Sequence, residues 1–292
     1  MNVEQSIESL VSIGITTKNR WQDLELTLNI LIKCNLDRKV SILIYDDGSD
    51  QPCPFHWEKL PLNIQLKRFD ESKGYIVRRN QLAEAIETKY YLSLDDDSFP
   101  VAGSLSEALE YAQSHENDLF CLAFPIYNPV LGKHQSRSLQ SQPYQVRSFI
   151  GCGHLIHRSR FLELGGYREE LTHQGEEMEI AARALQKGYR CYHFPNLQIH
   201  HTASNQGRNW YRMDYYGARN KILWNDWFIP PEQRTIKQCR TMLSFIILAA
   251  RVRRWGPIEG IMAAFSSISK YNHCRYSMSK DIYQSWQTFP HS

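Results

Sequence analysis

The stretch that decides the fold is Tyr90-Tyr91-Leu92-Ser93-Leu94-Asp95-Asp96-Asp97, in which a short run rich in aromatic and apolar residues leads into three carboxylates. Such a run predicts a buried β-strand whose carboxyl end carries the aspartates. Three adjacent like charges repel one another, and a divalent cation is the simplest means of neutralising them. Oxygen ligands with no cysteine or histidine close by in the sequence favour Mg²⁺ or Mn²⁺. A solvated turn with a helix cap is the alternative interpretation.

A second acidic strand end occurs earlier, in Ile42-Leu43-Ile44-Tyr45-Asp46-Asp47-Gly48-Ser49. Ligands of open α/β sheets bind beyond the carboxyl ends of the strands, so both acidic ends can face one crevice. A carboxylate in this position can accept a hydrogen bond from a nucleotide base or a ribose hydroxyl. Asp-Gly is also common in ordinary turns, which is the alternative for this segment.

Strands and helices are expected to alternate along the first two hundred residues. Short β-type runs occupy residues 10–16, 40–45, 62–69, 90–94, 119–124 and 197–199. Helical spacing occurs at residues 21–31 and 83–86, after the capping residue Ser104, and over 176–187, which ends at Gly188. This alternation predicts an α/β sandwich with a largely parallel sheet.

Composition limits the protein classes that this chain can belong to. Its 292 residues are 42% hydrophobic, which excludes a disordered or fibrous protein. The formal net charge of +3 argues against a general nucleic-acid binder. Seven scattered cysteines without a C-x-x-C pair predict reduced thiols and a cytoplasmic location. Residues 1–8 lack the basic start of a secretory signal.

The sequence changes character at about residue 205, which predicts a main domain at 1–205 and a helical extension at 206–292. Within the extension, the apolar run 242–250 is followed by Arg251, Arg253, Arg254 and Trp255. This combination suits a helix that lies on an anionic membrane surface. The alternative is a helix packed on the main domain with a solvated basic end.

These segments, in this order, resemble family 2 glycosyltransferases with the GT-A fold, over about residues 10–205. The matching segments are 11–20 (VSIGITTKNR), 46–49 (DDGS), 73–74 (KG), 78–80 (RRN, similar to the family's Ala-Arg-Asn), 95–97 (DDD, containing Asp-x-Asp), 151–153 (GCG), 164–167 (LGGY) and 176–183 (EEMEIAAR). The resemblance implies a GT-A nucleotide-diphospho-sugar transferase fold. Arg219-Asn220 is similar to a pattern in the helix that follows the transferase domain in bacterial members; a helix N-cap or surface pair is the alternative.

The resemblance also implies roles for individual residues. Those placed at the nucleotide sugar are Thr16, Asn19, Arg20, Asp46, Asp47, Lys73, Arg79, Asp95, Asp96, Gly151, Cys152 and Gly153. The metal is implied at Asp97 and Asp95, with His201, which follows the expected strand 197–199, as a further ligand; a packed histidine is the alternative. Glu177 matches the family's usual base, but the family more often has Glu-Asp here, so Glu176 is a rival. Both acids would also stabilise a helix N-terminus.

The activity implied by the resemblance is an inverting, metal-dependent transfer of a sugar from a nucleoside diphosphate, with UDP or dTDP expected and Mn²⁺ or Mg²⁺ as cofactor. The acceptor would be a saccharide or a lipid-linked saccharide, as in surface-polysaccharide assembly, on the cytoplasmic face of a membrane. An inactive sugar-nucleotide-binding scaffold is one alternative. A nucleotidyltransferase is another, although the sequence lacks a glycine-rich triphosphate loop near its N-terminus.

Overall fold

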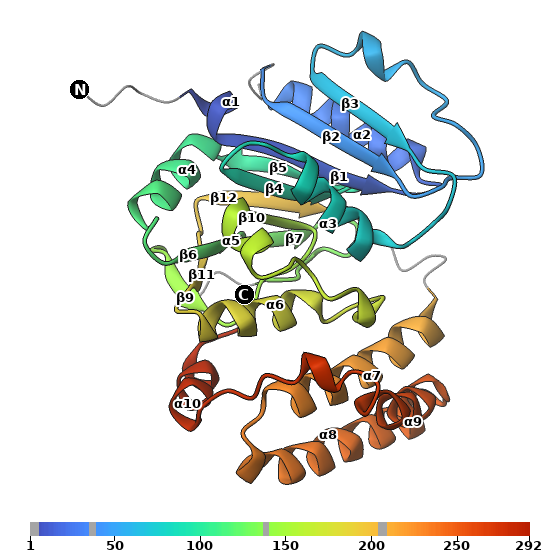
Figure 1. Cartoon of the computed structure of the whole chain (residues 1–292). Helices are drawn as coiled ribbons and strands as arrows, with labels where there is room; N and C mark the ends of the chain where they lie inside the picture. Colours follow the sequence, from blue (N-terminus) through green and yellow to red (C-terminus); the bar gives the residue numbers. More distant parts are fainter. Residues whose placement is uncertain (1–5, 35–38, 137–139, 204–208) are drawn as a thin grey trace.

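The computed structural model describes residues 6–34, 39–136, 140–203 and 209–292, and an eight-stranded sheet forms its centre (Figure 1). The strand order is β3-β2-β1-β4-β10-β6-β11-β9. These strands are β1 (Val11–Thr17), β2 (Ser41–Asp46), β3 (Asn63–Arg68), β4 (Tyr90–Asp95), β6 (Leu119–Ala123), β9 (Tyr144–Val146), β10 (Gly153–His157) and β11 (Arg190–His193). The five strands predicted between residues 10 and 124 are confirmed, with each end shifted by at most one residue.

The direction of the strands brings the two acidic strand ends to one edge. Strands β3, β2, β1 and β4 are parallel neighbours, so the carboxyl ends of β2 and β4 lie on either side of the end of β1. By contrast, β10 runs antiparallel to both β4 and β6, and β9 runs antiparallel to β11. The sheet is therefore mixed rather than largely parallel, because a late segment of the chain inserts between two earlier strands.

A second, four-stranded sheet has the order β5-β12-β7-β8. Its strands are β5 (Ser98–Gly103), β7 (Ile126–Asn128), β8 (Lys133–His134) and β12 (Leu197–His201). Antiparallel pairing sets His201 opposite Ser98, immediately after the aspartate cluster. The expectation that His201 follows the strand is wrong, because β12 continues two residues further and includes it.

Helices cover both faces of the large sheet (Figure 1). Those of the first two hundred residues are α1 (Ile7–Leu10), α2 (Trp21–Lys33), α3 (Tyr75–Ala85), α4 (Leu105–Ser114), α5 (Arg158–Glu163) and α6 (Glu176–Gln186), with 3-10 turns η1 (Trp57–Lys59) and η2 (Glu169–Leu171). One hydrophobic core includes residues of α2 and α4, and the other includes residues of α3, α5 and α6. Ser104 caps α4 and Gly188 follows α6 with a positive φ, as predicted.

The C-terminal region is helical, as predicted. It comprises α7 (Trp210–Phe228), α8 (Pro231–Val252), α9 (Gly256–Ile268), the 3-10 turn η3 (Asn272–Cys274) and α10 (Lys280–Thr288). Trp224 and Trp227 of α7 belong to the same hydrophobic core as Ile180 of α6. The expected domain boundary at 205/206 lies outside the described residues, so the division into 1–205 and 206–292 stays a prediction.

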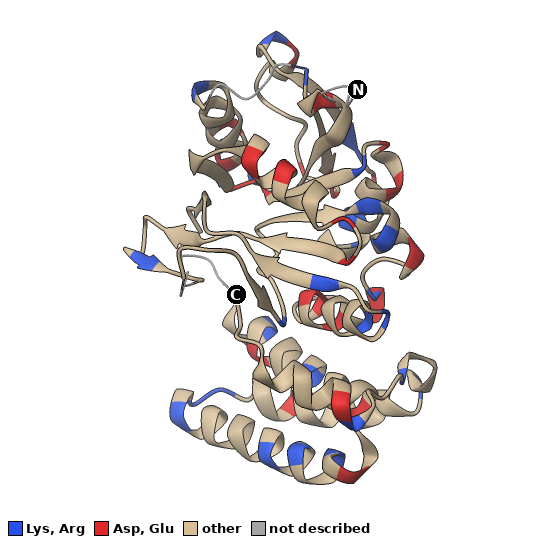
Figure 2. Ribbon diagram, turned by 90° about the vertical axis from the view of Figure 1, so that its left-hand side faces the viewer, with Lys and Arg blue, Asp and Glu red and all other residues tan. Residues whose placement is uncertain are grey.

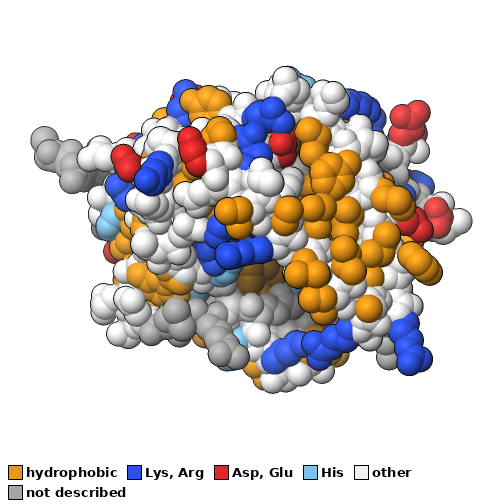
Figure 3. All heavy atoms as spheres, turned by 90° about the horizontal axis from the view of Figure 1, so that it is seen from below, with side chains coloured by type: hydrophobic (Ala, Val, Ile, Leu, Met, Phe, Trp, Pro, Cys, Tyr) orange, Lys and Arg blue, Asp and Glu red, His pale blue; other side chains and the backbone are white. Residues whose placement is uncertain are grey.

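Helix α8, the lowest in Figures 1 and 2, has two different faces. Ala249 is buried, whereas Leu243, Ile246 and Ile247 are exposed, so only one side of the apolar run packs against other helices. Figure 2 shows Lys and Arg along α8 and around its C-terminal end. Figure 3 shows hydrophobic side chains gathered on the underside of the molecule.

Among the described helices, we find none that is long and apolar enough to cross a lipid bilayer.

Candidate active site

Asp95, Asp97 and His201 form a cluster where β4 ends. One ligand atom from each side chain lies within 4.8 Å of those from the other two. Oδ1 of Asp97 is buried without a hydrogen-bond partner of good geometry among the described residues, and it lies 3.2 Å from Nε2 of His201. Two ligands that bind one cation at about 2.1 Å and at right angles lie about 3 Å apart. The donor set and its spacing therefore fit a divalent cation.

The surroundings of His201 orient its ring for this purpose. Oε1 of Gln135 lies 3.0 Å from Nδ1 and can accept its proton, so Nε2 is the ring nitrogen that faces Asp97 and can offer a lone pair to a cation. Burial lowers the pKa of His201, but the Asp97 carboxylate outweighs this and the net shift is upward. For Asp97, burial raises the pKa, and the opposing effects of His201 and Arg20 leave it below its usual value. The cluster thus favours a charged Asp97.

Asp96 does not join the cluster. Its Oδ2 accepts a hydrogen bond of 2.8 Å from Thr17, and its Oδ1 lies 3.1 Å from Nη1 of Arg20. Burial raises the pKa of Asp96 well above its usual value. Arg20, whose side chain is 44% exposed, also pairs with Oδ2 of Asp97. Arg20 therefore bridges the buried Asp96 and the candidate metal ligand.

Arg79 connects the cluster to the start of α6. This buried side chain, from α3, donates to Asp95, and its Nη1 lies 3.5 Å from Oε1 of Glu176. Oε2 of Glu176 is buried without a hydrogen-bond partner among the described residues. Burial raises the pKa of Glu176. Glu176 is thus an enclosed acid held near a single arginine.

Glu177 is the more accessible of the two acids. Its residue is half-buried, whereas Glu176 is 1% exposed. Burial and the neighbouring Glu176 raise the pKa of Glu177 to about 8. A side chain at Gly151 would overlap Oε1 of Glu177 and Nη1 of Arg79. The predicted loop 151–153 therefore lies directly against Glu177 and Arg79, and a larger residue at position 151 would displace these side-chain ends.

Asp47 holds the turn that begins α3. Its Oδ1 accepts from Lys73 N and Arg78 Nε, and its Oδ2 accepts from Ser72 Oγ and Gly74 N, at 2.7–2.8 Å. Each carboxylate oxygen thus already accepts two hydrogen bonds. Arg78, at the alanine position of the family motif, is buried and stacks on Phe69 at 3.6 Å. The role of Asp47 at the nucleotide base stays a prediction.

The other residues predicted at the nucleotide sugar lie in strands and in turns. Asn19, with a φ of 57°, exchanges hydrogen bonds with Asp50 at 2.7 and 3.0 Å. Asp46 accepts from the backbone and hydroxyl of Ser49. Four residues remain. Thr16 on β1 lies opposite Asp95 of β4, and Gly153 begins β10 opposite Leu94. Lys73 is exposed, whereas Cys152 is buried and its carbonyl accepts a hydrogen bond from the Ser98 hydroxyl. Their roles toward a ligand also stay predictions.

Sequence reasoning missed one contact that positions the acids. The pair Arg219-Asn220 is neither an N-cap nor a surface pair, since both residues are buried in the middle of α7. Nδ2 of Asn220 lies 2.8–2.9 Å from the carbonyl oxygens of Leu171, His173 and Gln174. These residues lead directly into α6. The similarity to a pattern in bacterial family members singled out this pair in the sequence, but it did not indicate that the loop before α6 is its partner.

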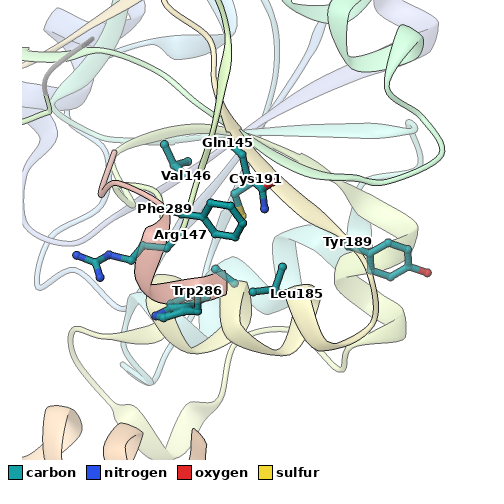
Figure 4. A pocket seen from close by; sticks show the side chains of 9 residues that line it. Gln145, Val146, Arg147, Leu185, Tyr189, Cys191, Trp286 and Phe289 are labelled. Atoms are coloured by element: carbon teal, nitrogen blue, oxygen red, sulfur yellow. The ribbon is translucent and has the colours of Figure 1, made fainter. Parts of the chain in front are cut away.

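A small cavity lies elsewhere, between the C-terminal half of α6 and α10 (Figure 4). It is lined by Gln145, Val146, Arg147, Ala181, Leu185, Tyr189, Cys191, Trp286 and Phe289. In Figure 4 the Phe289 ring points into this space and the guanidinium of Arg147 points away. None of these lining residues belongs to the acidic cluster, so the cavity is separate from the candidate active site.

Comparisons with known proteins identify the family and the fold of this chain. A family model described as glycosyl transferase family 2 matches residues 12–166. The pre-mycofactocin glycosyltransferase of Mycobacterium tuberculosis strain H37Rv is 25% identical over 206 residues, which are 62% of this chain and 42% of that protein. This chain thus spans less than half the length of that curated relative.

Solved structures with similar folds have low sequence identity. GalNAc-T7 with UDP, GalNAc and Mn²⁺ has a TM-score of 0.62 and 17% identity, covering 78% of this chain and 49% of that one. The mannosyltransferase PcManGT from Pyrobaculum calidifontis with GDP-Man and Mn²⁺ has a TM-score of 0.57 and 14% identity. This match covers 95% of this chain and 78% of that one. S. aureus TarS 1-349 with UDP-GlcNAc has a TM-score of 0.55 and 13% identity. This match covers 91% of this chain and 93% of that one. These likenesses establish the GT-A fold, and because the family model covers more than half of the chain, this protein belongs to glycosyl transferase family 2.

Proposed function

We propose that this protein transfers a sugar from a nucleoside-diphosphate sugar to an acceptor hydroxyl, with inversion at the anomeric carbon. The observation that carries the proposal is that one arginine, Arg79, contacts both Asp95 of the candidate metal site and Glu176 of the acid pair on α6. The candidate cation ligands and the candidate base therefore belong to one site. The structural relatives named above were solved with UDP, UDP-GlcNAc or GDP-Man, which supports a donor of this class. We favour UDP or dTDP as the nucleotide, as the sequence resemblance implies.

Asp95, Asp97 and His201 would hold a divalent cation. An imidazole ligand favours Mn²⁺ over Mg²⁺, because Mg²⁺ prefers oxygen ligands and retains its waters. Two of the structural relatives contain Mn²⁺. A bound cation would neutralise the charge that develops on the departing diphosphate. Arg20, which now pairs with Oδ2 of Asp97 and is partly exposed, is placed to exchange that contact for a donor phosphate.

Glu177 would be the general base. Its carboxylate takes the proton of the acceptor hydroxyl while the new bond from oxygen to the anomeric carbon forms. The bond from that carbon to the diphosphate breaks, and its electron pair leaves with the nucleotide. A pKa of about 8 makes the deprotonated form of Glu177 a stronger proton acceptor than an ordinary carboxylate. Glu176 is enclosed beside Arg79 and would hold the arginine rather than meet the acceptor.

The other residues that the sequence resemblance places at the nucleotide sugar complete the proposed site. Thr16, Asn19, Asp46, Asp47, Lys73, Asp96 and the loop Gly151, Cys152 and Gly153 would bind or shape the nucleotide-sugar site. The acceptor we propose is a saccharide, free or lipid-linked, on the cytoplasmic side of a membrane in polysaccharide assembly. An inactive nucleotide-binding scaffold would need no accessible base, whereas Glu177 is half-buried and carries a raised pKa next to Gly151.

Thermal unfolding with UDP, dTDP, GDP or CDP, each with and without Mn²⁺, tests the donor site. A ligand at about 100 times its Kd should stabilise the fold by roughly 2.7 kcal/mol. We expect one nucleotide to raise Tm only with Mn²⁺, and Asp97→Ala to abolish this rise. Asp226→Ala is the matched control, because Asp226 is also buried and paired with an arginine, Arg275, but lies on α7. It should lower Tm while keeping the nucleotide-dependent rise.

The reaction itself is tested with the sugar nucleotide that passes this screen. Release of nucleoside diphosphate on addition of a saccharide acceptor, with NMR of the product's anomeric proton, would establish transfer and its stereochemistry. Nucleotide binding without any acceptor-dependent release would instead favour the scaffold. Loss of the Mn²⁺-dependent rise in both aspartate variants would contradict the assignment of Asp97.

A further inference from the structure

Helices α8 and α9 leave a joint apolar surface uncovered. We define the outer face by Ile236, Leu243, Ile246 and Ile247 of α8 with Met262 and Phe265 of α9, all of them at least 48% exposed. The two helices pack against each other, and Figure 3 shows the hydrophobic side chains as a broad patch on this side. Soluble monomers rarely expose contiguous apolar patches of this kind without a function.

The buried sides of these helices are already occupied. Ala249 of α8 and Ala264 of α9 are buried, and Gly260 fits against the backbone of Tyr215 on α7. Ile236, Leu243 and Ile247 recur at spacings of seven and four residues, so they form one stripe along α8. The outer face is therefore a second apolar face, and the fold of the described chain does not use it.

Positive charge borders this stripe. Residues 231–255 contain the basic residues Arg234, Lys237, Arg240, Arg251, Arg253 and Arg254 and the single acid Glu232. Arg240 and Arg251 stand four residues after Ile236 and Ile247, so each arginine lies next to an apolar residue of the stripe on the same face of the helix. Both are exposed, and neither forms an ion pair with a residue that the structure describes. Figure 3 shows Lys and Arg at the margins of the hydrophobic patch.

We propose that the outer face binds the surface of an anionic lipid bilayer. The apolar side chains would enter the boundary between headgroups and acyl chains, and the flanking arginines would meet lipid phosphates. Trp255, 71% exposed at the corner between α8 and α9, has the side chain that prefers this interface. A protein partner or a second copy would cover the apolar stripe but would need acids opposite the arginines, whereas an anionic membrane offers both features.

The surface lies across α7 from the candidate active site. One side of α7 contacts α8 and α9, and Asn220 on the same helix contacts the loop before α6. Membrane binding by this face goes beyond the proposed sugar transfer and holds whether or not the site is active. It would keep the acidic cluster off the bilayer by the thickness of α7 and its neighbours.

Flotation with vesicles tests the proposal on the full chain. We expect binding to vesicles of phosphatidylcholine with 30% phosphatidylglycerol and little binding to phosphatidylcholine alone, with a loss in high salt. Each arginine near the surface contributes about a fivefold change in partitioning, so Arg240→Gln with Arg251→Gln should weaken binding about 25-fold. Ile247→Asp should abolish it. Leu26→Asp is the matched control, because Leu26 is 48% exposed on α2, outside this surface, and should bind as the unmodified chain does.

Three outcomes would overturn the proposal: no binding of the unmodified chain to anionic vesicles, equal binding by Ile247→Asp, or equal binding to neutral vesicles. A dimer that Ile247→Asp dissociates, with no vesicle binding, would assign the surface to a second copy instead. Thermal unfolding with nucleotide and Mn²⁺, without vesicles, monitors the proposed donor site separately. It should be the same in all these variants, so failure at the membrane and failure of the transferase proposal are distinguishable.

Discussion

Replacing Asn220 by alanine should slow sugar transfer without weakening donor binding. The Asn220 amide has two N–H donors, and three carbonyl oxygens of the loop before α6 lie within 2.8–2.9 Å of its nitrogen. That loop is held in a costly conformation, because Thr172 and Gln174 have φ values of 61° and 67°. A non-glycine residue in this region costs about 1–2 kcal/mol. Asn220 therefore stabilises a backbone that would otherwise relax.

The expected loss of stability can be bounded from these contacts. Two lost donors, each leaving a buried or part-buried carbonyl unsatisfied, cost about 1–3 kcal/mol apiece. Alanine returns about 0.5 kcal/mol through its helix propensity, and relaxation of the loop recovers part of the remainder. We therefore expect Asn220→Ala to lose about 2–4 kcal/mol. Relaxation would also move Glu177, and a displacement of about 1 Å can reduce the rate about 100-fold.

Unfolding in urea and steady-state kinetics with the identified donor measure both effects. Asn225→Ala is the matched control, since Asn225 is also buried on α7 but its amide bonds Gln238 and Thr241 of α8. It should lose stability and keep kcat. The Mn²⁺-dependent rise in Tm should persist in both variants, because Asp95, Asp97 and His201 lie outside the loop. Equal kcat in Asn220→Ala and the unmodified protein, or equal losses of kcat in both variants, would refute a positioning role.

Three further changes test the acid pair and its surroundings. Glu177→Gln should lower kcat about 10²–10⁴-fold while preserving the nucleotide-dependent rise in Tm; a smaller loss than that of Glu176→Gln would make Glu176 the base. The pKa of Glu177 is raised in the folded state, so this carboxyl keeps a proton that the unfolded chain releases, and its contribution to stability is lost as pH rises toward 8. The free energy of unfolding in urea, measured for Glu177→Gln and for the unmodified protein, should therefore shift in favour of the variant between pH 5 and pH 8. Gly151→Ala should reduce kcat by displacing Glu177, whereas Gly217→Ala on α7, where a side chain would make only an ordinary contact with Gln174, should keep kcat and raise stability by about 0.5–1 kcal/mol.

Local pattern was sufficient for the strands and for the acidic edge of the sheet. The runs ending at Asp46 and Asp95 have the composition of buried strands, and parallel neighbours bring their ends together without any further information. The same pattern could not reveal that β10 enters between β4 and β6, because pairing partners are chosen by the whole chain. Gly151 reaches Glu177 through that insertion, so the contact depends on topology rather than on the motif alone.

The contacts that complete the site join residues far apart in the chain. His201 meets Asp97 because β12 pairs with β5, and Asn220 meets the loop before α6 because α7 packs against it. Neither contact follows from residue spacing. Arg78 is a different case, since its side chain stands at the alanine of a recognised motif and bonds Asp47. A departure from a motif indicates that the contacts at that position differ from those in the family. It does not indicate which residue the different side chain contacts.

The charges of the site indicate why these distant contacts matter. Five acids, Asp95, Asp96, Asp97, Glu176 and Glu177, gather around two arginines, Arg20 and Arg79. Burial raises the pKa of Asp96, Glu176 and Glu177, so the isolated chain relieves the excess negative charge by holding protons. Asp97 instead stays charged beside His201 and Arg20. The fold therefore separates two kinds of acid in one site: Asp97, which stays ionised where a cation fits, and Glu177, which in the proposed reaction becomes the base for the acceptor hydroxyl after it has released its own proton.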